Sequence, residues 1–184
     1  MGLASERPEL ADFTTQPALA FAEAVWAADA LVRRQAPIVR LDELDGYLAG
    51  YRAREGLPAA KRILSFSRAK TDSGPETLVR LILEDAGLPK MAVNQPVYRD
   101  GQLIRYQDID VVGYSIDVEY QGMHHFSSAQ QAHDDMVRRE ELRRLGITVV
   151  EVAHEDLARP LDMVRRVAQL VAEKEGIRLP GPQS

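Results

Sequence analysis

Two short segments near the middle of the chain constrain its fold most. "YQDIDVVG" (106–113) and "GYSIDVEYQG" (113–122) both alternate apolar with acidic or amide residues. A period of two is typical of a β-strand with one apolar and one polar face. The polar positions are Asp108 and Asp110 in the first segment, and Asp117, Glu119 and Gln121 in the second. Like charges opposite one another destabilise a sheet, so this pair of strands needs something to offset the repulsion.

The elements around these strands predict the fold class. Caps, turn signals and periodicity predict helices at 73–89, 127–146 and 160–176. Strands are predicted at 93–98, 103–112, 114–120 and 147–153. The order α-β-β-β-α-β-α predicts an α/β fold with a mixed central β-sheet flanked by helices.

The chain before this region has a different pattern. Apolar residues at helical spacing, and prolines before or at helix starts, predict helices at 18–34, 41–54 and 58–70. We therefore divide the chain into a small all-helical region (1–72), an α/β domain (73–176) and a tail (177–184). Helices of this length are marginal alone in water. They are expected to pack on the α/β domain or on a second copy of the chain, which would give a homodimer.

Composition narrows the classes of protein. The 184 residues are 45% hydrophobic and 28% charged, as in an ordinary globular protein. The absence of cysteine excludes disulfides and thiolate metal sites. No apolar run approaches the roughly 20 residues of a membrane helix, and no signal pattern opens the chain, so a cytoplasmic location is expected. The net charge of −5 argues mildly against a nucleic-acid partner, although it can hide local basic patches.

An ordered set of short motifs runs through residues 73–175. They are "SGPET" with Glu76, "RYQDID" with Asp108, "VEYQG" with Glu119 and Gln121, "HHF" with His125, and "DMVRREELRRLGITVVEV" with Asp135, Arg138, Leu142 and Gly146. The set resembles the PD-(D/E)XK nuclease superfamily, and most of all its very-short-patch-repair-like endonuclease domains. Many bacterial relatives of those domains are associated with abortive-infection-type antitoxins. The helices from 18 to 70 resemble, more weakly, the segment before the domain in longer actinobacterial proteins. Those proteins usually begin with a winged-helix DNA-binding module, which we do not recognise here.

The resemblance implies a restriction-endonuclease-like core and a Mg²⁺- or Mn²⁺-dependent endodeoxyribonuclease acting in phage defence, mobile-element biology or repair. Mg²⁺ prefers a few carboxylates and retained waters, and it neutralises charge on a reacting phosphate. The implied ligands are Asp108, Glu119, the backbone carbonyl of Tyr120, and Glu76 for a metal-bound water or a second ion. Asp110 is the alternative to Asp108 as the motif aspartate.

Three further residues receive roles from the resemblance. Gln121 stands where the commoner motif has a lysine, and its amide orients the attacking water without accepting a proton. His125 contacts a phosphate or acts as an acid. Arg138 contacts the nucleic-acid backbone.

Other interpretations of the same residues stay open. Ser73 and Glu76 form a capping-box pattern, and Asp117 has the pattern of a solvated strand residue. A catalytically inactive, nuclease-like regulatory or partner-binding module is the alternative function, favoured by Gln121 and the acidic net charge. RNA as substrate and a partner protein that targets the nuclease to DNA also stay open.

Overall fold

The computed structural model describes residues 16–52, 54–122 and 129–177. The chain forms two compact units that divide between Gly87 and Leu88. The sequence placed the boundary at residue 72 instead. The helix that follows residue 72 is grouped with the preceding helices because it packs against the first of them. Each unit is described below by itself.

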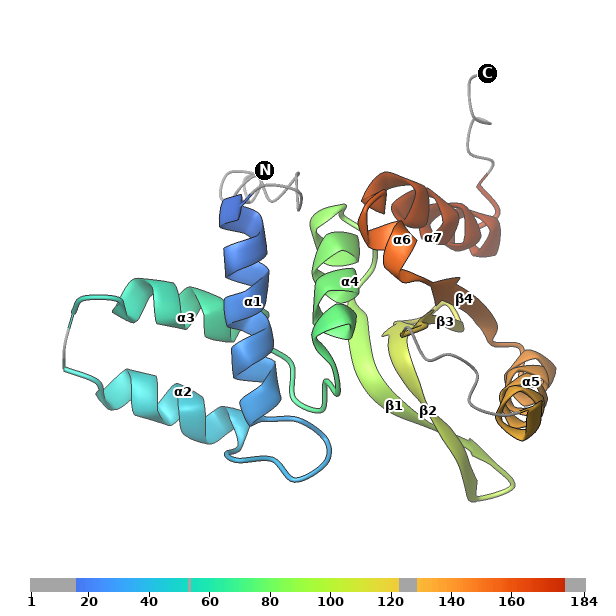
Figure 1. Ribbon diagram of the computed structural model, residues 1–184, viewed down its shortest axis with the longest axis horizontal. Helices are drawn as coiled ribbons and strands as arrows, with labels where there is room; N and C mark the ends of the chain where they lie inside the picture. The colour runs from blue at the N-terminus through green and yellow to red at the C-terminus, as the bar shows by residue number, and fades with distance from the viewer. Residues whose placement is uncertain (1–15, 53, 123–128, 178–184) are drawn as a thin grey trace. The chain divides into compact units, whose positions relative to one another are not determined.

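The first unit is helical (Figure 1). Its helices are α1 (Gln16–Leu31), α2 (Leu41–Gly50), α3 (Leu57–Phe66) and α4 (Gly74–Asp85). Helix α1 packs against both α3 and α4, and α2 packs along α3. The rings of Phe21 and Phe66 meet edge to face with centroids 5.3 Å apart, which joins α1 to α3. The three helices predicted before residue 72 are confirmed.

A buried charge cluster joins α1 to α4. Asp29 is 1% exposed, and one of its oxygens accepts a hydrogen bond from the backbone N–H of Arg68 at 2.7 Å. The other oxygen accepts from the Thr77 hydroxyl at 2.9 Å and from the Arg80 guanidinium at 3.2 Å. Arg80 also pairs with Glu84 one turn further along α4, at 3.1 Å. The buried carboxylate therefore has partners on both oxygens.

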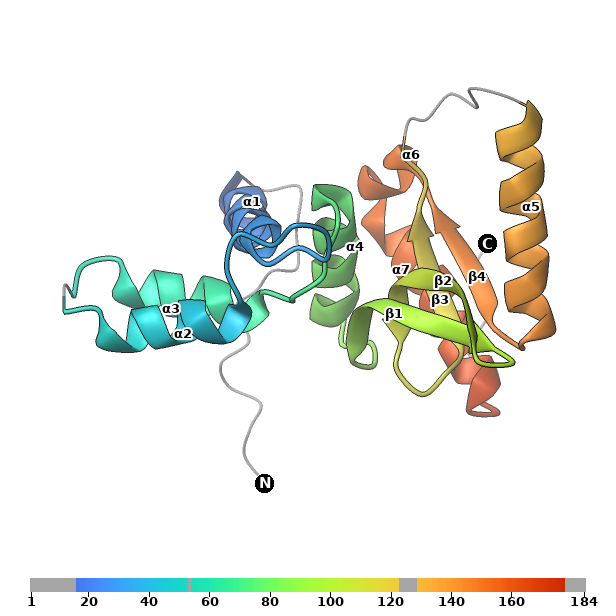
Figure 2. The same ribbon diagram turned by 90° about the horizontal axis from the view of Figure 1, so that it is seen from below.

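The second unit is an α/β layer structure. Its strands are β1 (Met91–Arg99), β2 (Gln102–Val111), β3 (Ile116–Tyr120) and β4 (Thr148–Val152), and its helices are α5 (Ala129–Arg144), α6 (His154–Leu157) and α7 (Pro160–Lys174). The sheet has the order β1-β2-β3-β4, antiparallel except for the parallel pair β3–β4. Helices α5 and α7 lie on opposite faces of the sheet (Figure 2). The predicted mixed sheet flanked by helices is confirmed.

The apolar face of the sheet forms the core of this unit. Ile109 lies directly across from Val118, and Val111 from Ile116, and all four side chains are fully buried. On β4, Val150 and Val152 continue the same face. Helix α7 contributes its buried side chains Met163, Val167 and Val171. Strands β2 and β3 are thus held by their apolar faces, which leaves their acidic positions on the other side.

Two smaller features complete the fold. The short helix α6 was not predicted; Asp156 accepts a hydrogen bond from the backbone N–H of Ala153 at 2.8 Å and caps its first turn. No helix within the described residues has the length and apolar character needed to cross a membrane.

Candidate functional site

The sheet register collects the acidic residues of β2 and β3 on one face. Asp110 lies directly across from Asp117 in the antiparallel pair. Continuing that register by two residues places Asp108 across from Glu119, because side chains alternate with a period of two. Glu151 of β4 lies beside Glu119 in the parallel pair and forms an ion pair with Arg139 of α5. The acidic face is therefore the one that α5 covers, opposite the apolar face.

Asp117 is the most deeply buried member of this face. Its side chain is 0% exposed, neither carboxylate oxygen accepts a hydrogen bond from a donor group, and the only side chain that shares a hydrogen bond with it among the described residues is the Glu119 carboxyl. Burial, together with the negative charges of Glu119 and Asp108 and against the opposing charge of Arg105, raises its pKa to about 9. Without a cation at the site, Asp117 therefore holds a proton at neutral pH. The interpretation of Asp117 as a solvated strand residue is wrong, because the neighbouring elements of the fold bury its strand on both faces.

Burial also raises the pKa of Asp110, but this residue is less deeply buried than Asp117. Glu119 is 5% exposed, so it belongs with Asp117 to the buried part of the face. Four carboxyl groups on two neighbouring strands thus share one partly desolvated environment.

Arg105 of β2 supplies a positive charge to this environment. Its guanidinium lies 2.6 Å from a Glu119 oxygen, an ion pair that lacks hydrogen-bond geometry. The same guanidinium donates to the backbone carbonyl of Tyr106 at 3.2 Å. Arg105 was not among the site residues predicted from the sequence, because alternation along β2 assigns it to the face opposite Asp108. Only the folded geometry shows that its long side chain reaches Glu119.

Gln121 lies just beyond the end of β3. Its backbone N–H donates to the carbonyl of Val152 at 2.8 Å, so extended pairing with β4 continues by one residue. Its side chain is exposed. Tyr120, whose carbonyl is the predicted metal ligand, is the last residue of β3 and pairs with Val152. The predicted roles of both residues stay predictions.

Glu76 lies in α4, in the helical unit, and both of its oxygens are engaged there. One contacts the Ser73 hydroxyl at 2.8 Å and the other accepts from the backbone N–H of Asp72 at 3.1 Å. The Ser73 hydroxyl in turn accepts from the backbone N–H of Glu76 at 3.3 Å. The Ser73 hydroxyl thus makes one half of the capping-box alternative, while the Glu76 carboxylate reaches the backbone N–H of Asp72, one residue before the N-cap. A metal-binding role for Glu76 stays a prediction.

Two predicted site residues are beyond what the structure describes. His125 lies outside the described residues, and so does the side chain of Arg138, although its backbone belongs to α5. Their predicted roles are untested.

The acidic face has the right chemistry for a hard divalent cation. Its donors are carboxylate oxygens, which Mg²⁺ and Mn²⁺ prefer, and those of Asp117 are buried without partners. Within the described residues, however, no three His, Asp or Glu side chains are arranged to hold a metal ion. Arg105 pairs with Glu119 instead. The donor set fits the ion, and a bound cation would compete with Arg105 for Glu119.

Comparisons with known proteins give limited help. No family model matches the chain. Two uncharacterized proteins of Mycobacterium tuberculosis, from strains CDC 1551 / Oshkosh and ATCC 25618 / H37Rv, are each 27% identical to it over 128 residues. The match covers 69% of this chain and 47% of each relative, so the chain spans about half the length of the curated relatives it matches.

One solved structure is similar in fold. It is the catalytic domain of the homing endonuclease I-Bth0305I, with a TM-score of 0.43 and 16% identity over 56% of this chain and 98% of that domain.

Proposed function

We propose that this protein is a metal-dependent endonuclease that hydrolyses phosphodiester bonds of DNA. The observation that carries the proposal is the pair of unpartnered, fully buried Asp117 oxygens beside Glu119 and Asp108. A buried carboxyl group that accepts no hydrogen bond lowers the free energy of unfolding, and groups perturbed in this way cluster at functional sites. Three carboxyl groups on neighbouring strands have the ligand chemistry of Mg²⁺ or Mn²⁺.

The divalent ion would polarise a phosphoryl oxygen and lower the pKa of a bound water. Asp108 and Glu119 would hold it, with the Tyr120 carbonyl as the further predicted ligand. Asp117 is available as an additional ligand once its proton is released. Because a cation favours the ionised carboxylate, metal binding would release that proton, and metal affinity should rise with pH.

The remaining residues have roles that their chemistry permits. Arg105 carries a planar guanidinium suited to a phosphate oxygen, and a cation that binds Glu119 would free it for that contact. The amide of Gln121 would orient the attacking water. His125 and Arg138 would contact the phosphate and the nucleic-acid backbone, as the motif resemblance implies.

The biological setting is also part of the proposal. A nuclease of this kind would act in the cytoplasm, in phage defence, mobile-element biology or repair. A DNA-targeting partner protein would supply sequence selectivity.

The test is cleavage of plasmid and short duplex DNA with Mg²⁺ or Mn²⁺ by purified wild type, Asp108→Asn and Glu119→Gln. We expect nicks or breaks with 5′-phosphate ends, and a loss of about 10³-fold in either variant, because both carboxylates hold the same charge clamp. Glu151→Gln is the matched control, since Glu151 shares the face but is exposed and paired with Arg139. Full activity in Glu119→Gln would contradict the proposed site.

A second function has one observation in its favour. The Arg105–Glu119 ion pair places a built-in cation where a metal ligand is expected, as in a nuclease-like module that regulates or binds a partner without cleaving. Titration calorimetry separates the two functions. Binding of Mg²⁺ or Mn²⁺ that disappears in Glu119→Gln supports the enzyme. Absence of binding in wild type, together with absence of cleavage, supports the inactive module.

A further inference from the structure

The positive charge of this acidic protein is concentrated in one stretch of the helical unit. Residues 31–70 carry nine Lys and Arg against four Asp and Glu, a net charge of +5, whereas the whole chain has −5. The rest of the chain therefore carries −10. A polyanion is therefore attracted by residues 31–70 and repelled by the rest of the chain. This asymmetry points to a separate place on the molecule for an anionic partner.

The basic stretch has a defined structure between α1 and α2. The carbonyl of Leu31 accepts hydrogen bonds from the backbone N–H groups of Ile38 and Val39, at 2.8 and 3.1 Å, which closes a loop over residues 31–39. Arg33 donates to the carbonyl of Ala36 within the loop, at 3.3 Å. The backbone N–H of Lys70 donates to the carbonyl of Val32 at 3.0 Å, which brings a lysine from beyond α3 beside the loop. The cations are therefore held on an ordered frame.

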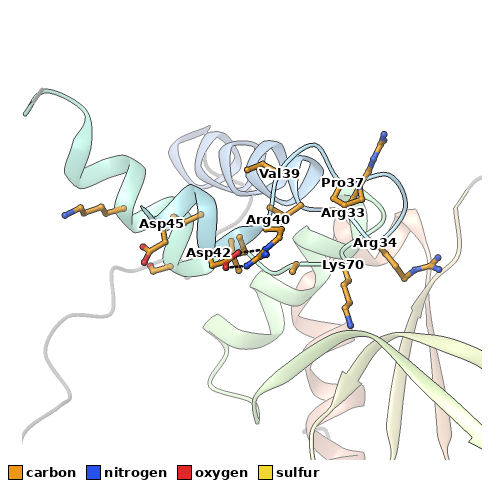
Figure 3. Close-up of a pocket in the computed structure, with 14 residues that line it drawn as sticks. Arg33, Arg34, Pro37, Val39, Arg40, Asp42, Asp45 and Lys70 are labelled. Atoms are coloured by element: carbon orange, nitrogen blue, oxygen red, sulfur yellow. Dashed lines mark hydrogen bonds and ion pairs between the residues drawn. The ribbon is translucent and has the colours of Figure 1, made fainter. Parts of the chain in front are cut away.

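A hollow of about 820 Å³ opens beside this loop and reaches α3 (Figure 3). Its charged lining comprises the cations Arg33, Arg34, Arg40, Lys61 and Lys70 and the acids Asp42 and Asp45. Arg40 pairs with Asp42, and Arg34 pairs with Asp72 at 2.6 Å. The side chains of Arg33, Arg34 and Lys70 extend outward from the loop in the close-up. The lining therefore carries more positive than negative charge, and its longest cationic side chains face outward.

We propose that this basic loop, with Lys61 and Lys70, binds the phosphate backbone of nucleic acid and holds the substrate for the proposed nuclease. The inference rests on the proposed function. Guanidinium groups match phosphate oxygens in geometry and charge, and backbone phosphates dominate nucleic-acid affinity. The acidic face repels the same backbone until a metal ion neutralises it. Binding energy beyond the few cationic contacts proposed at that face is therefore expected from another part of the chain, and residues 31–70 hold the excess positive charge.

The test measures binding separately from cleavage. Fluorescence anisotropy of a labelled 20-base-pair DNA duplex, in EDTA and over a range of salt concentrations, gives the affinity and its salt dependence for the full chain. The variant Arg33→Gln/Lys61→Gln/Lys70→Gln removes three charges from the basic loop and its neighbours. The control Arg159→Gln/Arg165→Gln/Lys174→Gln removes three exposed charges from the start and length of α7.

We expect the first triple variant to bind about tenfold or more weakly, with a slope of log K against log salt lower by up to about 2.7, which is about 0.9 for each lost phosphate contact. The control should bind like wild type. Lys61→Gln alone, at an exposed position of α3, should lower the slope by about one and serves if the triple variant fails to fold. Unchanged affinity in the first triple variant, or equal loss in the control, would overturn the inference.

Further ligands identify the class of anion, and the cleavage assay separates this inference from the proposed function. A duplex RNA of the same length competing as well as DNA would assign the shared phosphodiester chemistry without a choice of sugar. Polyglutamate competing better than either would overturn the nucleic-acid assignment. If wild type cleaves DNA while the triple variant binds as tightly, the basic loop is excluded and the nuclease stands. If the triple variant loses binding while no metal supports cleavage, the loop stands and the nuclease is excluded.

Discussion

Asp29 and Asp117 are both aspartates with at most 1% of the side chain exposed, one in each unit, yet their surroundings differ completely. Asp29 accepts hydrogen bonds from Arg68, Thr77 and Arg80. Asp117 accepts no hydrogen bond from a donor group, and its charged neighbours are mainly other carboxylates, of which Glu119 is close enough to share a hydrogen bond with it. Burial raises the pKa of both, but Arg80 and the hydrogen bonds oppose the shift at Asp29, whereas Glu119 and Asp108 add to it at Asp117.

The comparison separates a structural charge from a functional one. Satisfying both oxygens of Asp29 joins α1 to α4, so that carboxylate is explained by folding alone. The carboxylate of Asp117 weakens the metal-free fold, and its retention is explained by a ligand that the fold does not supply. Four experiments test this difference, and they follow in order of decreasing expected effect.

The largest effect should be on catalysis. Asp117→Asn keeps the size of the side chain and resembles the protonated acid, but it cannot ionise to bind a cation. We expect DNA cleavage to fall by about 10²–10³-fold, or about 2.7–4 kcal/mol of transition-state stabilisation. Single-turnover cleavage at saturating Mg²⁺ measures it. Activity equal to wild type would show that Asp117 is not part of the site.

Asp29→Asn should instead act on stability. It leaves the Arg80 guanidinium buried beside a neutral group, and we expect the free energy of unfolding to fall by about 3 kcal/mol. Urea denaturation measures the change. Asp42→Asn, which breaks the exposed Arg40–Asp42 pair, is the control and should cost under about 1 kcal/mol. Equal effects of the two substitutions would remove the structural role assigned to Asp29.

The pH dependence of stability should reveal the proton on Asp117. Its folded pKa of about 9 lies above the ordinary value of 3.8, so the folded state binds the proton more tightly than the unfolded state. The stability tied to that proton is complete below about pH 4 and is lost as pH rises toward 9, by at most about 1.4 kcal/mol per pH unit. Measured in EDTA, wild type should therefore lose stability relative to Asp117→Asn across this window. A constant difference would show that Asp117 does not hold a proton, even though Glu119, Asp108, Asp110 and Arg105 share its surroundings.

Metal binding should give the smallest of the four effects. At ten times its dissociation constant, a cation adds about 1.4 kcal/mol to the free energy of unfolding, or about 3–6 °C in Tm. We expect Mg²⁺ or Mn²⁺ to raise the Tm of wild type and not that of Asp117→Asn. Asp42→Asn should respond like wild type. A rise that survives in Asp117→Asn would exclude Asp117 as a ligand, and one that also survives in Glu119→Gln would place the ion elsewhere.

Much of the fold was predictable because local patterns determine it. The period-two alternation in 106–113 and 113–122 predicted β2 and β3, and the helices between residues 18 and 70 followed from apolar spacing and proline positions. The boundary between the two compact units was harder to predict from the sequence. Helix α4 has a clear capping signal at Ser73, but its grouping with α1 depends on the buried Asp29–Arg80 pair, whose members are 51 residues apart.

Only part of the candidate site could be predicted from the sequence, for the same reason. Alternation assigned Asp108 and Glu119 to polar faces, and the register of β2 and β3, extended by one residue beyond the Ile109–Val118 pair, brings them to the same face. The sequence shows an aspartate at position 117 but does not show that its side chain is buried. The polar side of a strand in an antiparallel pair can face either water or protein. The sequence therefore predicted Glu119 as a site residue and left Asp117 as a solvated strand residue, although carboxylates two positions apart on one strand lie on the same face.

The sequence by itself therefore determined the order of helices and strands, the alternation that sorts β2 and β3 into two faces, and the excess of basic residues between 31 and 70. These depend on neighbours a few residues apart, whose spacing is read directly. Only the tertiary structure decided that Asp117 is buried without a partner, that Arg105 reaches Glu119, and that Glu76 caps its own helix. Burial and ion pairing depend on what covers a side chain, and most of the covering residues are distant in the sequence.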